Sequence, residues 1–119
     1  MAIRTVTNKQ QITAKTGTLA DQLSTNSYVN VGDMIDVTML KTKYFKFTAA
    51  TNNLLVNVLG SFDGGVTFDQ TLDANLSVTT SAAVAKTYTD PYSHVKVQVK
   101  AAVGGSQGTL STKFFGSWL

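Results

Sequence analysis

The chain has 119 residues, of which 43% are hydrophobic and 14% charged, and it contains no cysteine. This length fits one domain with its own core, and the absence of cysteine excludes disulfides and thiolate metal sites. The net charge of +3 comes from scattered lysines and a single arginine, Arg4. Nucleic-acid binders concentrate charge on one stripe, so we predict no nucleic-acid partner. We also predict no membrane span and no signal peptide, because no apolar run is long enough.

Residues 1–30 are rich in Thr, Gln, Asn and Lys, with only isolated apolar side chains. We predict an extended N-terminal arm or edge strand that is loosely tied to the core, the alternative being a disordered terminus. Within it, "LADQL" could form one helical turn, but nothing extends the pattern. The apolar residues of the arm are candidates for contacts with a partner: Ile3, Val6 and Ile12.

From about Met34 onward the dominant hydrophobic period is two, which is the period of a half-buried strand. The run "HVKVQVKAAV" places its valines on one face, and "KYFKFTA" does the same with Phe45 and Phe47. "NLLVNVLGSF" is apolar on both faces, which indicates a central strand covered on both sides. "VTFDQTL" alternates again, and "TLSTKFFGSWL" ends the chain with Leu110, Phe114 and Trp118 on one parity.

Turn residues separate these runs, at 51–53, 63–65, 89–92 and 104–108. Several short strands with regular turns are typical of sandwiches and related all-β folds. We therefore predict an all-β chain, with an antiparallel β-sandwich or jelly-roll-like single domain over residues 31–119 that follows the N-terminal arm.

The stretch "GSFDGGVTFDQTL" places an acidic, glycine-rich tip between two strand-forming runs. A calcium loop would need several oxygen ligands at close spacing, and Asp63, Asp69 and Asp73 do not follow such an order. A tight hairpin turn explains the run better, because Asp-Gly-Gly tolerates positive φ and a carboxylate accepts backbone N–H groups across the turn. The predicted structural turn consists of Ser61, Asp63, Gly64, Gly65 and Thr67.

The sequence offers no catalytic constellation. His94 is its only histidine, Gly-x-Ser-x-Gly is missing, and no phosphate loop or dinucleotide fingerprint occurs. The aspartates gather near turns, as in Asp33 with Asp36, where capping and solvation explain them. We predict a non-enzyme with no catalytic, cofactor-binding or metal-binding residues and no cofactor.

Three aromatic residues are candidates for a subunit interface or for the core: Tyr88, Tyr92 and Trp118. Phe114 and Phe115 begin the apolar end of the chain, which we expect to pack between protomers. An alternative is a carbohydrate-binding module, in which Tyr88 and Tyr92, with Trp118 as a further member, stack on sugar rings.

Residues 61–68 resemble the Asp-box, Ser-x-Asp-x-Gly-x-Thr-Trp, with Phe68 in the tryptophan position. In sialidase-like propellers this motif is a repeated structural hairpin away from the catalytic site. The resemblance covers eight residues, occurs once, and implies a hairpin rather than glycosidase activity.

A broader pattern is carried by residues 60–68, 90–92, 95–99 and 104–110. It resembles small β-sandwich virion proteins of tailed bacteriophages, which decorate capsids or build tail and baseplate parts. The resemblance implies a non-enzymatic capsid decoration (cement) protein, made in the host cytoplasm and located in the virion. It would form a homo-oligomer, with a trimer favoured, and stabilise the shell by binding the major capsid protein or another virion protein. A tail or baseplate component is the alternative.

Overall fold

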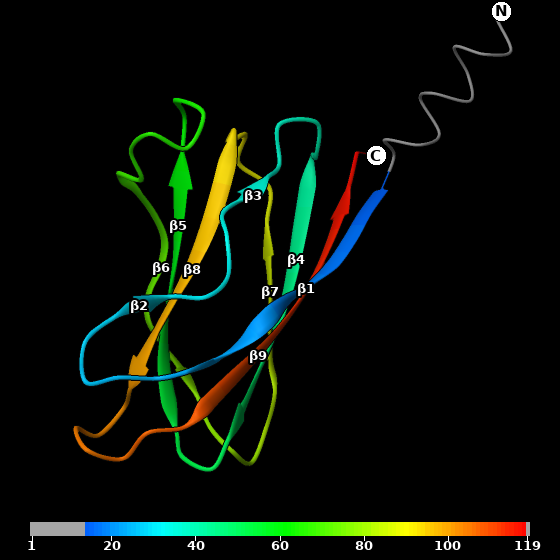
Figure 1. Cartoon of the computed structure of the whole chain (residues 1–119). Coiled ribbons are helices and arrows are strands. Elements are labelled where there is room, and N and C mark those ends of the chain that lie inside the picture. The colour runs from blue at the N-terminus through cyan, green and yellow to red at the C-terminus, as the bar shows by residue number, and fades with distance from the viewer. Residues whose placement is uncertain (1–13, 119) are drawn as a thin grey trace, which may run out of the picture.

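The computed structural model describes residues 14–118 (Figure 1). Its regular elements are all strands, and among the described residues no helix is long and apolar enough to cross a membrane. In chain order they are β1 (Ala14–Leu23), β2 (Val29–Asn30), β3 (Ile35–Asp36), β4 (Thr42–Ala50), β5 (Leu54–Ser61), β6 (Gln70–Val78), β7 (Val84–Tyr88), β8 (His94–Ala101) and β9 (Thr109–Ser117).

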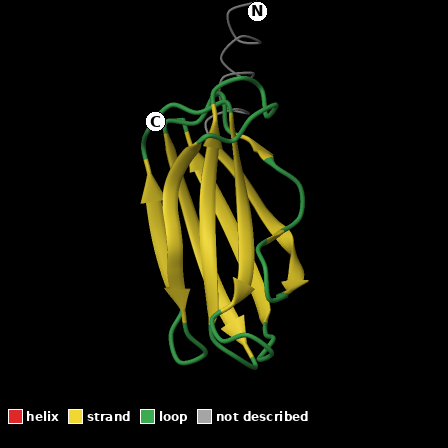
Figure 2. Ribbon diagram, turned by 90° about the vertical axis from the view of Figure 1, so that its left-hand side faces the viewer, coloured by secondary structure: helices red, strands yellow, loops and turns green. Residues whose placement is uncertain are grey.

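The strands form two antiparallel sheets. Sheet A has the order β1-β9-β4-β7, and sheet B has the order β2-β8-β5-β6, with β3 also paired to β8. The chain crosses repeatedly between the two sheets in the jelly-roll manner, so that β1 pairs with β9 and β4 with β7, whereas β5 and β6 are consecutive neighbours within sheet B. Figure 2 shows the strands of both layers running along the length of the molecule. The prediction of an all-β, jelly-roll-like sandwich is confirmed.

The core lies between the two sheets. In β4 and β8 every second residue is buried, as the alternating sequence predicts. Phe45 is at the centre of the aromatic contacts, with ring centroids 5.7 Å from Phe47 and 5.0 Å from Phe114. The expectation of a central strand covered on both sides holds in part for β5: it lies between β8 and β6, but Leu55 and Leu59 on its outer side are only half-buried, because loops rather than another sheet lie over the outer face of sheet B.

Side chains join the two sheets at the margin where β6 faces β7. The Tyr88 hydroxyl donates to Asp73 Oδ2 at 2.6 Å, and Lys86 Nζ lies 3.6 Å from the same oxygen. Asp73 comes from a stretch of β6 with two register shifts, and Asn75 in that stretch has a φ of 53°. These bulges bend the edge strand and bring Asp73 toward β7.

β1 forms the opposite edge of sheet A and pairs only with β9 among the described strands. "LADQL" is therefore part of a strand rather than a helical turn, because its backbone continues the ladder with β9. Contacts outside the ladder also hold β1: Lys15 Nζ donates to the carbonyl of Asp36 in β3 at 3.0 Å, and Leu19 packs against the core beside Gly32, in the loop between β2 and β3. The candidate contacts Ile3, Val6 and Ile12 lie outside the described residues.

Candidate functional site

The loop after β5 is organised around Asp63. Its carboxylate accepts hydrogen bonds from the Ser61 hydroxyl at 2.7 Å and from Thr67, through the backbone N–H at 2.9 Å and the hydroxyl at 2.6 Å. Ser61 Oγ in turn accepts from the Gly65 N–H at 3.0 Å. Hydrogen bonds from the Thr67 side chain and backbone, followed by the bond from Ser61, hold the pKa of Asp63 well below its usual range. The side chains of Ser61, Asp63 and Thr67 thus have structural partners within the turn.

This loop is longer than the tight hairpin that the sequence predicts. β5 ends at Ser61 and β6 begins at Gln70, so Val66 lies outside the strands and is 81% exposed. The loop is longer because residues 62–69 extend over the outer face of sheet B. There Gly65 has a φ of +88° and lies against Met34 and His94. A side chain at Gly65 would collide with Met34, which explains the glycine.

Loops cover the outer face of sheet B. Lys96 Nζ lies 4.5 Å from the centroid of the Phe68 ring, and Lys100 Nζ lies 5.0 Å from that of Tyr28. The Tyr28 hydroxyl reaches β6, where it donates to Asn75 Oδ1 at 2.5 Å. Both lysines of this face are therefore engaged by aromatic rings of their own chain. We call this surface the covered face.

No loop of residues 14–118 gives the outer face of sheet A such a cover, as the exposure of its side chains shows. Its register places Thr16, Phe115, Tyr44 and Thr87 in one row across the four strands, and Thr18, Lys113, Lys46 and Ala85 in the next. All eight of these residues are exposed. We call the surface the open face, and its middle, formed by Tyr44, Phe115, Lys46 and Lys113, the central block.

The central block combines two rings and two cations. The ring centroids of Tyr44 and Phe115 are 5.8 Å apart with an interplanar angle of 40°, and each residue is 42% exposed. Lys46 and Lys113 are direct cross-strand partners, and among the described residues neither forms an ion pair or a cation–π contact. A shallow depression of about 210 Å³ lies at the block.

The predicted interface residues have different surroundings. Phe114 is 5% exposed and packs on Phe45, so its assignment to an interface is wrong: it faces the neighbouring sheet rather than solvent. Phe115, on the other parity, is on the open face. Tyr88 is half-buried, with its ring against Phe45, and burial and the adjacent Asp73 raise its pKa. Its ring is committed to the core, so it does not form a sugar-stacking platform.

The end of the molecule that carries the 89–92 loop holds a buried lysine. Lys43 is fully buried on the core side of β4, donates to the Asp90 carbonyl, and lies 5.7 Å from the Tyr92 ring centroid. Burial lowers the pKa of Lys43, and Asp90 partly opposes this. The ring centroids of Tyr92 and Phe62 are 5.2 Å apart. The contacts of Tyr92 and Asp90 thus anchor the 89–92 loop. Trp118, directly after β9, is half-buried.

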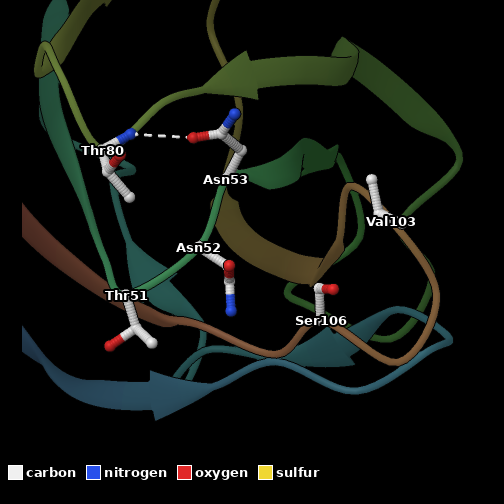
Figure 3. Close-up of a pocket in the computed structure, with 6 residues that line it drawn as sticks. All are labelled: Thr51, Asn52, Asn53, Thr80, Val103 and Ser106. Atoms are coloured by element: carbon white, nitrogen blue, oxygen red, sulfur yellow. Dashed lines mark hydrogen bonds between the residues drawn. The ribbon is translucent and has the colours of Figure 1, made fainter.

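A pocket of about 210 Å³ opens at the other end, between the β4–β5 turn and the loops after β6 and β8 (Figure 3). Its lining is uncharged: Thr51, Asn52, Asn53, Thr80, Val103 and Ser106. Asn53 Oδ1 accepts from the Thr80 N–H at 3.0 Å, and Asn52 Nδ2 donates to the Gln107 carbonyl at 2.8 Å. The lining has no titratable group for acid–base chemistry. In residues 14–118 no group of three or more His, Cys, Asp or Glu side chains converges on a point.

No known protein family matches the sequence, and no curated protein is similar to it. Among solved structures, the chain is similar to one described as "Bacillus endospore appendages form a novel family of disulfide-linked pili", at 11% identity and a TM-score of 0.50, covering 90% of both chains. It is also similar to one from infectious bursal disease virus, Gx strain, at 13% identity and a TM-score of 0.49, covering 86% of this chain and 30% of that one. At these identities the similarity to the appendage structure concerns the fold.

Sequence reasoning missed the central block. The alternation in "KYFKFTA" and "STKFF" places Tyr44 with Lys46 and Lys113 with Phe115 on the polar side of each strand. What the sequence lacks is the pairing of β4 with β9, which sets these residues opposite one another.

Proposed function

We propose that the chain is a non-enzymatic structural protein that assembles with copies of itself, and more specifically a capsid decoration protein of a tailed bacteriophage. The observation that carries the proposal is the free edge of β1. From Ala14 to Leu19 this strand pairs in regular register with β9, and no other described strand pairs with its second edge. An extended chain can add to such an edge through backbone hydrogen bonds.

The other edges of the two sheets are protected. β2 and β3 have two residues each, β7 has five, and β6 carries two register shifts. Short and bulged edges are the usual devices that prevent pairing with another chain. β1 is ten residues long and its first register shift comes only after Leu19, so it is the edge suited to strand addition.

Strand addition at β1 would also enlarge the open face, because sheet A would continue from one copy into the next. Many copies would then present repeated central blocks to a shell, so that weak single contacts add up. With no cysteine in the chain, this assembly would rest on backbone pairing and surface contacts rather than on disulfides. A tail or baseplate component would use the same contacts at another location.

Light scattering across concentrations tests the assembly. Thr16→Lys/Thr18→Lys adds two charges to the free edge strand, and Thr87→Lys/Ala85→Lys adds them to the same two rows at the opposite edge, on β7. We expect an oligomer that dissociates with the β1 changes and persists with the β7 changes. A wild-type chain that stays monomeric at all concentrations would contradict the proposal and favour a free-standing binding module.

Immunogold labelling of the phage that carries the chain tests its location. Label on the capsid supports the decoration role, label on the tail supports the alternative, and virions without label would contradict both.

A further inference from the structure

We propose that the open face of sheet A docks an acidic segment of a partner protein, whose carboxylates bind Lys46 and Lys113 while its apolar side chains pack on Tyr44 and Phe115. This inference deepens the proposed function and rests on it, since the partner is a component of the assembly that the chain joins. It specifies the binding surface and the chemistry of the occupant.

The charge arrangement points to an anion. Lys46 and Lys113 stand directly opposite each other on neighbouring strands, and like charges in that position destabilise a sheet. The only acidic residue in the strands of sheet A is Asp21, at the register shift of β1, and it forms no ion pair with either lysine. A carboxylate placed between the two ammonium groups would remove their repulsion and gain charge-assisted hydrogen bonds.

The covered face shows that this exposure is specific to sheet A. There the corresponding lysines, Lys96 and Lys100, each lie over an aromatic ring supplied by a loop. On the open face the rings are present as well, but Tyr44 and Phe115 contact each other, and no ring or carboxylate among residues 14–118 pairs with the two lysines. Rings next to free cations suit a ligand that has both apolar and acidic groups.

The geometry favours a protein over a sugar or a nucleic acid. The two rings are tilted by 40°, so they do not present one plane to a pyranose. The block is flanked by small side chains, Thr16, Thr18, Thr87 and Ala85, so the surface is smooth and its depression is shallow. Two lysines form no stripe along which a phosphate backbone could run.

A second copy of the chain is a poorer occupant than a different protein. Five of its seven aspartates already accept side-chain hydrogen bonds within their own chain, so releasing them would disrupt local contacts: Asp36, Asp63, Asp69, Asp73 and Asp90. The other two, Asp21 in β1 and Asp33 between β2 and β3, lie on separate segments and do not form an acidic segment. A segment with several carboxylates close together is therefore better supplied by another protein.

The test measures binding of the full chain to a fluorescently labelled random copolymer of glutamate and tyrosine, with polyglutamate, polygalacturonate and oligothymidylate as comparison probes. We expect the copolymer to bind best, since it offers both carboxylates and rings. K46E/K113E should weaken binding roughly tenfold or more, which corresponds to the loss of one charge-assisted hydrogen bond. K96E/K100E makes the same change in net charge on the covered face and should weaken binding less than about twofold.

Two further measurements separate the possible failures. Thermal unfolding confirms that both double variants fold, and light scattering compares their masses with that of the wild type. Equal weakening by the two variants, or tighter binding of polygalacturonate or oligothymidylate than of the copolymer, would overturn the inference while leaving assembly through β1 intact. A K46E/K113E chain that no longer oligomerises would overturn it too, because the face would then bind a second copy.

Discussion

The two outer faces of this sandwich carry the same kinds of side chain, lysines and aromatic rings, but arrange them differently. Sheet B carries two outward lysines four residues apart on β8, and sheet A carries two directly across from each other on β4 and β9. Each face also has two aromatic rings nearby. On sheet B the rings come from loops and lie over the lysines. On sheet A the rings come from the strands and contact each other, and within the part of the chain that the structure describes the lysines have no ring or carboxylate partner. Composition alone therefore does not decide which face is available to a partner; the origin of the rings does.

Asp73 provides a polar link between the two sheets, because it joins sheet B to Tyr88 and Lys86 of sheet A. Asp73→Ala should lower the free energy of unfolding by about 1–3 kcal/mol, because the half-buried Tyr88 hydroxyl loses its acceptor. Asp69→Ala removes an exposed carboxylate nearby and should cost less than about 0.5 kcal/mol. Chemical denaturation of both variants measures the difference, and equal losses would mean that the two sheets are not joined at this margin.

The two faces can also be compared by removing one tyrosine hydroxyl from each and measuring the change in stability. Tyr28→Phe deletes the hydrogen bond to Asn75 on the covered face and should lower stability by about 0.5–1.5 kcal/mol. Tyr44→Phe on the open face removes a hydroxyl that forms no hydrogen bond with the described residues, so its stability should stay within about 0.5 kcal/mol of the wild type. Denaturation midpoints report both values. A larger loss for Tyr44→Phe would reverse the assignment of covered and open faces.

Removing a lysine should raise the free energy of unfolding on the open face and lower it on the covered face. Lys113→Thr relieves the repulsion with Lys46 and should stabilise the free chain by about 0.2–1 kcal/mol at low salt. Lys96→Thr deletes the contact with Phe68 and should destabilise it by about 0.5–1 kcal/mol. Raising the ionic strength should reduce the gain for Lys113→Thr, since salt screens exposed charges. Changes of the same sign would show that the faces do not differ in this way.

The smallest effect concerns the loop over the covered face. Because hydrogen bonds from Thr67 and Ser61 lower the pKa of Asp63 in the folded chain, its contribution to stability is complete above the unfolded pKa of about 3.9. That contribution should be lost as the pH falls below this value. In Asp63→Asn the acid sensitivity of the loop should be reduced. NMR shifts of Gly65 and Thr67 follow the titration, and a midpoint at or above the unfolded pKa would contradict the network.

Alternation in the sequence is enough to predict the strands of the core. β4, β8 and β9 follow it closely, since each has one face in the core and a side chain reverses face at every residue. The Asp-box-like spacing likewise identifies the residues of the turn. The length of that loop was not predictable, because its course depends on contacts of Gly65 with Met34 and His94, which come from other parts of the chain.

The open face required the sheet register. Phe114 and Phe115 are adjacent in sequence, yet one fills the core and the other faces solvent, and only the pairing of β9 with β4 and β1 shows which neighbours each one meets. Tyr28 lies in a loop without hydrophobic periodicity, and Phe68 lies in a segment whose alternation predicts a strand although it forms a loop. Their positions over Lys100 and Lys96 therefore depend on long-range contacts that a local pattern does not contain.

Amide hydrogen exchange of β1 at low and high protein concentration tests assembly through the free edge most directly. Strand addition at Ala14–Leu23 should slow the exchange of the β1 amides that do not bond to β9, and peptides from β6 and β7 should exchange at the same rate at both concentrations. Exchange in β1 that stays unchanged while the mass of the particle rises would contradict the account, because assembly would then use another surface.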